Sequence, residues 1–145
     1  MNHLLVALDF SKFSSIVENV AYTLAKKINA TVILVTIVDK AIDYEPVNTG
    51  QVFTDIWEES LRMANENLNK VKIAHPDVET SIISFLGDPD QDIIDLAVKY
   101  KAQFIVIGTH GRSGLTKLIM GSTAEFVIRH ATIPVIVVPY RMGSH

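Results

Sequence analysis

Glycines and hydroxyl residues are concentrated in one stretch, where a short apolar run gives way to an amphipathic one. Gly108, Gly111 and Gly121 are followed directly by Ser122 and Thr123. Glycine lets the backbone approach a ligand closely, and backbone N–H groups at a loop or a helix start can bind an anion. These residue types in this order point to the binding of phosphate groups.

The same stretch carries positive charge and one histidine. Arg112 and Lys117 would lie near a bound phosphate, although Arg112 fits a solvated loop residue equally well. His110 lies between two of the glycines, but the sequence places no base partner near it, so we do not assign it a catalytic role.

A purely structural interpretation of these residues stays open. Ser122 and Glu125 have the spacing of a capping box, in which Ser122 would only cap its own helix. Gly108 could serve only to end a strand. The two roles of Ser122 are compatible, because a capped helix start still presents free N–H groups.

Strands and helices that alternate along the chain must position these glycine and hydroxyl residues. Short apolar runs rich in β-branched residues predict five strands, at residues 4–8, 31–38, 78–86, 104–107 and 134–138. Apolar residues at helical spacing predict helices over residues 15–28, 57–71, 89–100 and 124–130. Such alternation predicts a parallel sheet with helices on both faces.

Several boundary signals accompany these elements. Ser15 and Glu18 form a second possible capping box, and Asp88 followed by Pro89 is typical of a helix start. Tyr100 is expected on the apolar face of the third helix. Residues 39–50 show no clear period and predict a long loop, and whether it closes over a ligand is left open.

The glycine spacing resembles the nucleotide-binding signature of a known family. Gly108-x2-Gly111-x9-Gly121-Ser122 is similar to that of the universal stress proteins, in their ATP-binding branch. Three further segments resemble the same family: the first strand with its Asp-Phe-Ser, the Gly-Asp-Pro before the third helix, and the last strand (residues 9–11, 87–89 and 133–139). The resemblance covers nearly the whole chain.

This resemblance implies a specific α/β architecture. It is a single open five-stranded parallel sheet of order 3-2-1-4-5 with helices on both faces, Rossmann-like and similar to the adenine nucleotide alpha hydrolases. The first and fourth strands are then neighbours, and the winding reverses between them. Ligands in open α/β sheets bind at that point, at the carboxyl ends of the strands, which brings Asp9 and Gly108 to one place.

The resemblance also implies a role for each site residue. Asp9 would accept hydrogen bonds from ribose or adenine or help to hold a divalent ion, whereas its structural alternative is to cap the following helix. Ile37 would pack on the adenine ring, although a core role is equally consistent. The full set expected to bind ATP, or AMP or ADP, is Ala7, Leu8, Asp9, Ile37, Ile107, Gly108, Gly111, Arg112, Gly121, Ser122 and Thr123. Any Mg²⁺ would arrive with the nucleotide.

Composition excludes several classes of protein. The 145 residues are 48% hydrophobic and 20% charged, which predicts one globular domain over residues 1–140 and a short tail over 141–145 that fits a tag remnant or a natural end. The net charge of −3 argues against a nucleic-acid binder. With no cysteine, disulfides and thiolate metal sites are excluded, and the five histidines form no pair at metal-ligand spacing. No signal peptide or membrane-length apolar run is seen, so we expect a cytoplasmic protein.

Missing motifs narrow the enzyme classes. The chain has no Gly-Lys-Ser/Thr of a Walker loop, no glycine in the first strand–helix turn and no Gly-x-Ser-x-Gly elbow. We therefore expect a regulatory or stress-response protein that binds adenine nucleotide. Two alternatives stay open: a slow ATP-hydrolysing or phosphate-transferring enzyme, for which Asp9 and His110 are the only candidates, and a nucleotide-free dimeric interaction module.

The last strand predicts self-association. Its residues Val135, Ile136, Val137 and Val138 carry no charge on either face, and Pro134 and Pro139 bracket them. An apolar strand at a sheet edge invites pairing with another chain, so we expect a homodimer through antiparallel pairing of this strand. The alternative is that the C-terminal tail covers the edge.

Overall fold

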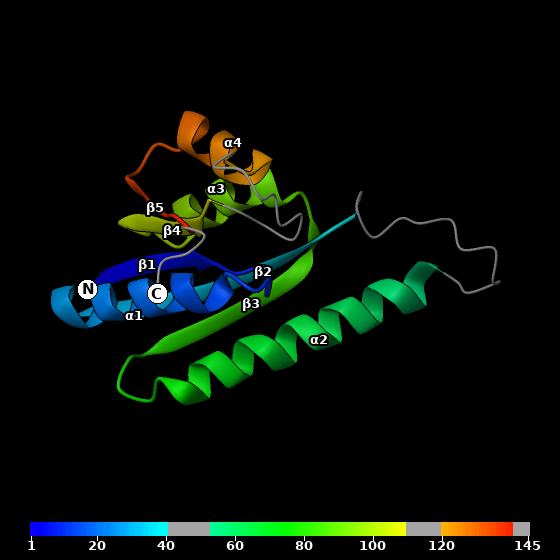
Figure 1. Ribbon diagram of the computed structural model, residues 1–145, viewed down its shortest axis with the longest axis horizontal. Helices are drawn as coiled ribbons and strands as arrows, with labels where there is room; N and C mark the ends of the chain where they lie inside the picture. Colours follow the sequence, from blue (N-terminus) through cyan, green and yellow to red (C-terminus); the bar gives the residue numbers. More distant parts are fainter. Residues whose placement is uncertain (41–52, 110–119, 141–145) are drawn as a thin grey trace.

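The computed structural model describes residues 1–40, 53–109 and 120–140. It contains one sheet of five parallel strands in the order β3-β2-β1-β4-β5 (Figure 1), which confirms the predicted fold class and strand order. The strands are β1 (Asn2–Ala7), β2 (Ala30–Asp39), β3 (Thr80–Gly87), β4 (Phe104–Gly108) and β5 (Val135–Val138). Residues 41–50 of the loop expected over 39–50, the tail at 141–145 and the residues His110, Gly111, Arg112 and Lys117 lie outside the described residues.

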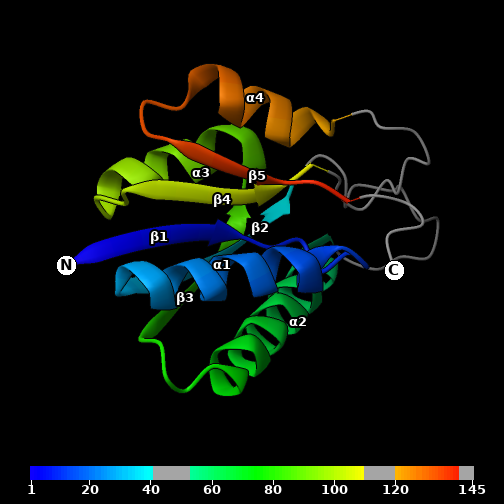
Figure 2. The same ribbon diagram turned by 60° about the vertical axis from the view of Figure 1, so that its left-hand side comes forward.

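Within the described residues, four helices cover the two faces of the sheet. They are α1 (Ser14–Ile28), α2 (Phe53–Ala74), α3 (Pro89–Lys99) and α4 (Ser122–His130). Helices α1 and α2 lie on one face, and α3 and α4 lie on the other (Figures 1 and 2). The result is the three-layer arrangement that alternating strands and helices predict.

The strands carry apolar residues on both faces because helices cover both. Leu4 and Val6 of β1 belong to the same apolar cluster as Leu68 of α2, whereas Leu5 belongs to the cluster on the other side, with Ile93 of α3. Consecutive strand residues point to opposite faces, so β1 contributes to both apolar clusters. Leu4, Leu5 and Val6 have no solvent exposure at all, which explains why this segment shows no alternation of polar and apolar residues.

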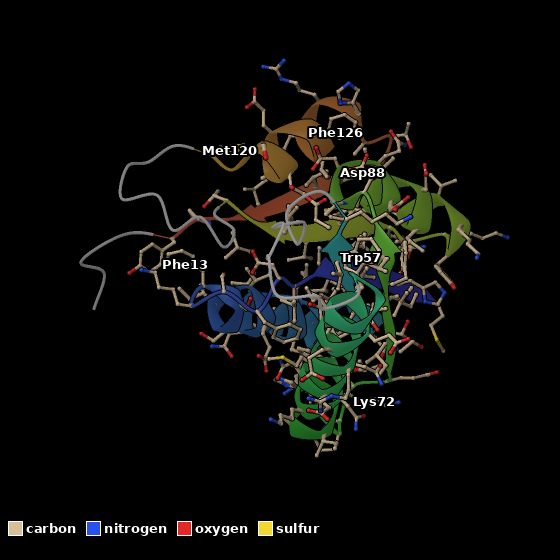
Figure 3. The ribbon with its side chains drawn as sticks, turned by 90° about the vertical axis from the view of Figure 1, so that its right-hand side faces the viewer. Phe13, Trp57, Lys72, Asp88, Met120 and Phe126 are labelled. Atoms are coloured by element: carbon tan, nitrogen blue, oxygen red, sulfur yellow. The ribbon has the colours of Figure 1, made fainter. Side chains whose placement is uncertain are left out.

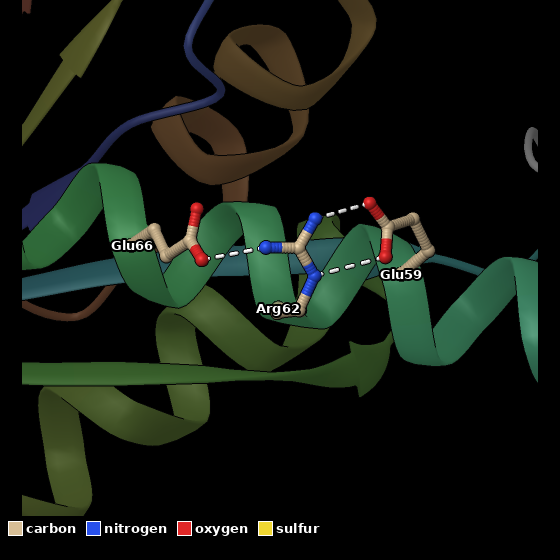
Figure 4. Close-up of polar contacts among 3 residues, drawn as sticks. All are labelled: Glu59, Arg62 and Glu66. Atoms are coloured by element: carbon tan, nitrogen blue, oxygen red, sulfur yellow. Dashed lines mark hydrogen bonds and ion pairs between the residues drawn. The ribbon is translucent and has the colours of Figure 1, made fainter.

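The outer face of α2 carries exposed charged side chains that pair with one another. Arg62 donates from Nε to Glu59 Oε2 (2.9 Å) and from a terminal nitrogen to Glu66 Oε1 (2.6 Å), as Figure 4 shows. The hydrogen bond from Arg62 lowers the pKa of the Glu59 carboxyl. Exposed pairs of this kind add little stability, so their main effect is to keep this face in water and the apolar stripe against the sheet.

Both predicted capping boxes are wrong. Helix α1 begins at Ser14 with Phe13 in the cap position and no side-chain cap, and Glu18 instead lies 2.8 Å from His75 Nε2. Helix α4 begins at Ser122 with Gly121 as its cap, and Glu125 pairs with Arg129 (2.7 Å). In each case the glutamate binds a residue of its own helix or of another part of the fold. The serine lies inside the helix, one or more positions after the cap residue.

Other boundaries differ in smaller ways. The start of α3 is as predicted, with Asp88 accepting from the N–H of Asp90 (3.0 Å) and Pro89 in the first turn. Tyr100 is not on the apolar face of α3 but follows it, 39% exposed. Asp39 belongs to β2 and pairs with Gly87, so the strand extends further than its apolar run.

Gly87 has no room for a side chain. A Cβ at this position would lie 2.1 Å from Asp92 Oδ2 and 2.9 Å from a ring carbon of Phe85. The same Asp92 oxygen accepts from the N–H of Asp88 (2.9 Å), so it cannot move without losing this bond. We expect Gly87→Ala to lower the free energy of unfolding by about 1–3 kcal/mol, as overpacking does, measured by urea denaturation. Adding Asp92→Ala should recover part of the loss, and a Gly87→Ala protein as stable as the parent would contradict this packing.

Candidate functional site

A cleft of about 240 Å³ lies at the carboxyl ends of β1, β2 and β4. All of the predicted site residues that the structure describes line this cleft: Ala7, Leu8, Asp9, Ile37, Ile107, Gly108, Gly121, Ser122 and Thr123. They come from four separate parts of the chain. Strands β1 and β4 are adjacent, with Leu4 opposite Phe104, and the winding of the sheet reverses between them, which is where open α/β sheets bind ligands.

The turn after β1 fixes the carboxylate of Asp9. Its Oδ1 accepts from the N–H of Ser11 (2.9 Å) and from the hydroxyl of Ser14 (3.1 Å). Between Asp9 and Ser11, Phe10 adopts a left-handed backbone (φ 56°), which is uncommon and strained for a bulky residue. Asp9 thus ties the turn to the first residue of α1 and also stands on the cleft wall. The predicted structural alternative, a cap on α1, is wrong, because no side chain caps this helix.

The end of β2 presents backbone groups to the cleft. The N–H of Val32 donates to Glu79 on the β3 side (2.9 Å), whereas the C=O of Val35 accepts from Leu8 on the β1 side (2.9 Å). Alternate residues of a parallel strand face alternate neighbours, so the N–H and C=O of Ile37 face the β1 side. Strand β1 pairs only as far as Ala7, and the buried hydroxyl of Thr36 donates to the C=O of Leu8 (2.8 Å). The backbone N–H and C=O of Ile37 are therefore directed into the cleft, beyond the end of β1.

The opposite wall of the cleft is the first turn of α4. Gly121 is its cap residue and is extended, with no side-chain cap bond. Ser122 is exposed and Thr123 is half-buried, and both line the cleft. The first amides of a helix have no partner within it and carry the positive end of the helix dipole. This wall is suited to an anion.

Charge is distributed unevenly along the cleft. Among the described lining residues, Asp9 and Asp39 are the only ionisable ones, and both lie on the side of β1 and β2. An anionic group would be repelled there and would be favoured at α4. No three acidic or histidine side chains among the described residues are grouped to hold a metal ion.

Several lining residues were missed at the level of sequence. They are Ser11, Phe13, Ser14, Val17, Val35, Thr36, Val38, Asp39, Pro89, Ile93, Thr109 and Ala124. The hydroxyl-rich turn at residues 11–15 was a usable signal, because it directly follows Asp9. Thr36 and Thr109 gave no signal, since their importance depends on which strand ends become neighbours.

The family of the chain is now clear. Residues 1–139 match the model of the universal stress protein family, and the chain belongs to that family. The universal stress protein MJ0531 of Methanocaldococcus jannaschii is 32% identical over 81% of this chain and 70% of its own length. Universal stress protein Rv2005c of Mycobacterium tuberculosis is 31% identical over 92% of this chain, which spans only 44% of that relative.

Solved structures share the fold. The structure of the protein MJ0577 superposes with a TM-score of 0.85 at 22% identity, over 97% of this chain and 96% of that one. A universal stress protein from Archaeoglobus fulgidus in complex with dAMP gives 0.66 at 24% identity, over 95% and 98%. A universal stress protein in complex with cAMP gives 0.70 at 20% identity, over 94% and 96%.

The helices also bear on the membrane question. Within the described parts of the chain, none is both long enough and apolar enough to span a bilayer.

Proposed function

We propose that this protein binds an adenine mononucleotide in the cleft and acts as a regulatory binding protein in a stress response. The observation that carries the proposal is the arrangement of two unlike walls around one cavity: the outward backbone edge of Ile37 on one side and the first turn of α4 on the other. A nucleotide has the same polarity, with a flat base at one end and phosphate at the other. The solved relatives that hold dAMP and cAMP support an AMP-type ligand.

The base is assigned to the β2 end. A backbone N–H and C=O of one residue offer a donor beside an acceptor, which is the complement of the N1 and N6 edge of adenine. The half-buried side chain of Ile37 and the buried ones of Ile107 and Leu8 supply apolar surface for the ring. Asp9 would accept hydrogen bonds from the sugar, and the phosphates would meet Gly121, Ser122 and Thr123. Gly108, Gly111 and Arg112 complete the proposed ligand set, and Mg²⁺ would arrive with a di- or triphosphate, keeping most of its waters.

A homodimer through β5 is part of the same proposal. Strand β5 ends the sheet and, among the described residues, pairs only with β4. Val135, Ile136 and Val137 are half-buried and uncharged, so a second copy pairing along this edge would remove apolar surface from water. We also propose that the protein works in the cytoplasm.

The test adds a negative charge where the phosphate should lie. Ser122→Glu at the exposed start of α4 favours the helix through its dipole but opposes an anion a few ångströms away, at a cost of about 1–4 kcal/mol. We expect AMP affinity, measured by calorimetry, to fall about tenfold or more, ATP affinity to fall further, and adenosine affinity to change little.

Ser81→Glu is the matched control. Ser81 is exposed near the start of β3, at the other end of the sheet, so this change should leave all three affinities unaltered. No binding of AMP, ADP or ATP to the parent protein would end the proposal. Recovery of unaltered ATP after long incubation would separate binding from slow hydrolysis.

A further inference from the structure

Thr109 is bonded to three different parts of the chain at the rim of the cleft. Its C=O accepts from the N–H of Gly121 (2.6 Å), and its N–H donates to the C=O of Val138 (3.1 Å). Its hydroxyl oxygen accepts from the N–H of Tyr140 (3.4 Å) and lies 3.5 Å from the C=O of Val138. One residue therefore joins the start of α4, the end of β5 and the segment after β5.

Tyr140 makes a second link from this segment back to the cleft. Its ring centroid lies 4.0 Å from that of Phe13, at an interplanar angle of 47°. Phe13 is buried, directly precedes α1 and lines the cleft, as Thr109 does; Figure 3 labels it at the start of that helix. The segment after β5 is thus attached to two walls of the cleft, while Tyr140 itself is not among the lining residues.

These links are weak enough to change. Hydrogen bonds of 3.4 and 3.5 Å are at the long limit of the usual range and contribute little. A shallow, partly open pocket of about 10 Å³ also lies among α1, the end of β4 and the segment after β5, lined in part by Phe13, Thr109 and Tyr140. Thr109 and Phe13 therefore border both this pocket and the cleft.

We propose that occupancy of the cleft is transmitted to the outer end of β5 through Thr109, Phe13 and Tyr140, so that nucleotide orders the edge along which a second copy pairs. This inference rests on the proposed function, because it takes the ligand to be an adenine nucleotide. Coupling is reciprocal: if AMP strengthens the dimer by some factor, dimerisation strengthens AMP binding by the same factor. Tyr140 acts here as a positioning residue, since it contacts the cleft only through other residues.

The experiment measures exchange and assembly with and without saturating AMP. We expect AMP to slow hydrogen exchange at the amides of Thr109 and Tyr140, and to lower the dimer dissociation constant in sedimentation equilibrium, each about fivefold or more. Tyr140→Ala removes the ring but keeps the backbone N–H. It should still bind AMP, with the ratio of dimer dissociation constants close to one. Tyr100→Ala, at an exposed tyrosine after α3, is the matched control and should keep the full ratio.

The outcomes separate the two proposals. Failure of the parent to bind AMP in calorimetry would overturn the proposed function and this inference with it. Binding of AMP with unchanged exchange and unchanged assembly would overturn only the coupling. Retention of the full ratio in Tyr140→Ala would overturn the role of Tyr140.

Discussion

Asp9→Asn should weaken AMP binding by about tenfold to a hundredfold without unfolding the protein. The asparagine keeps an oxygen at Oδ1 that can accept from Ser11 and Ser14 as the carboxylate does, so the turn after β1 should persist. What is lost is the charge, and a hydrogen bond to a charged acceptor contributes about 1.5–3 kcal/mol. At 1.4 kcal/mol for each factor of ten, this gives the expected range.

The control for this prediction is a second loss of one negative charge. Asp77→Asn removes a carboxylate that pairs with Lys26 (2.8 Å) on the surface and does not line the cleft. AMP affinity should be unchanged in this variant. Equal affinities for the parent and Asp9→Asn, with intact circular dichroism, would show that Asp9 only stabilises the turn after β1.

Tyr22→Ala should lower the free energy of unfolding by about 3–5 kcal/mol, as truncation of a large buried ring does. Tyr22 is 1% exposed, its hydroxyl lies 2.9 Å from Thr80 Oγ1, and its ring stacks on His75 at 3.7 Å and 5°. It thereby joins α1 to the loop before β3 and to β3 itself. Tyr22→Phe keeps the ring and should cost only about 0.5–1.5 kcal/mol.

The phenol also predicts a dependence on pH. Burial raises the pKa of Tyr22 above its ordinary value of 10.0. Above that pH the unfolded chain releases the proton while the folded chain keeps it, so the unfolded state binds fewer protons and stability falls as pH rises. The contribution is complete below about pH 10 and is lost above it. Denaturation curves should therefore show that Tyr22→Phe loses less stability than the parent between about pH 9 and 11, and parallel losses would contradict a buried neutral phenol.

The sheet was predictable from sequence because its strands are buried on both faces. The run at residues 104–107 is apolar throughout, the run at 31–38 is interrupted only by Thr31 and Thr36, and four predicted helices separate the strands, so few topologies remained. Most of the cleft followed from the strand order that the resemblance to the universal stress proteins implied, since that order brings Asp9 and Gly108 to one place. The local capping predictions failed: Ser15 and Ser122 do not cap their helices, because α1 begins at Ser14 and α4 at Ser122, so both serines lie inside the helix.

The remaining errors have a common physical cause. Asp39 extends β2 because its backbone pairs with Gly87, and Thr109 gains its role from Gly121, Val138 and Tyr140. The partners of Asp39 and Thr109 lie 12 to 48 positions away along the chain. They become neighbours only in the assembled fold, so the sequence next to Asp39 or Thr109 does not reveal them. Local spacing predicts which residues form an element, but not which distant backbone groups will face it.

The cleft also lies where the two apolar layers of the molecule meet. Leu8 belongs to the cluster under α1 and α2, whereas Ile107 and Ala124 belong to the cluster under α3 and α4, and all three border the same cavity. A molecule seated there would touch both halves of the interior at once. Substitutions that shift either helical layer by a fraction of an ångström would then change the affinity of the cleft for its ligand from a distance. Changes in the core of such a protein can therefore adjust binding while every contact residue stays the same.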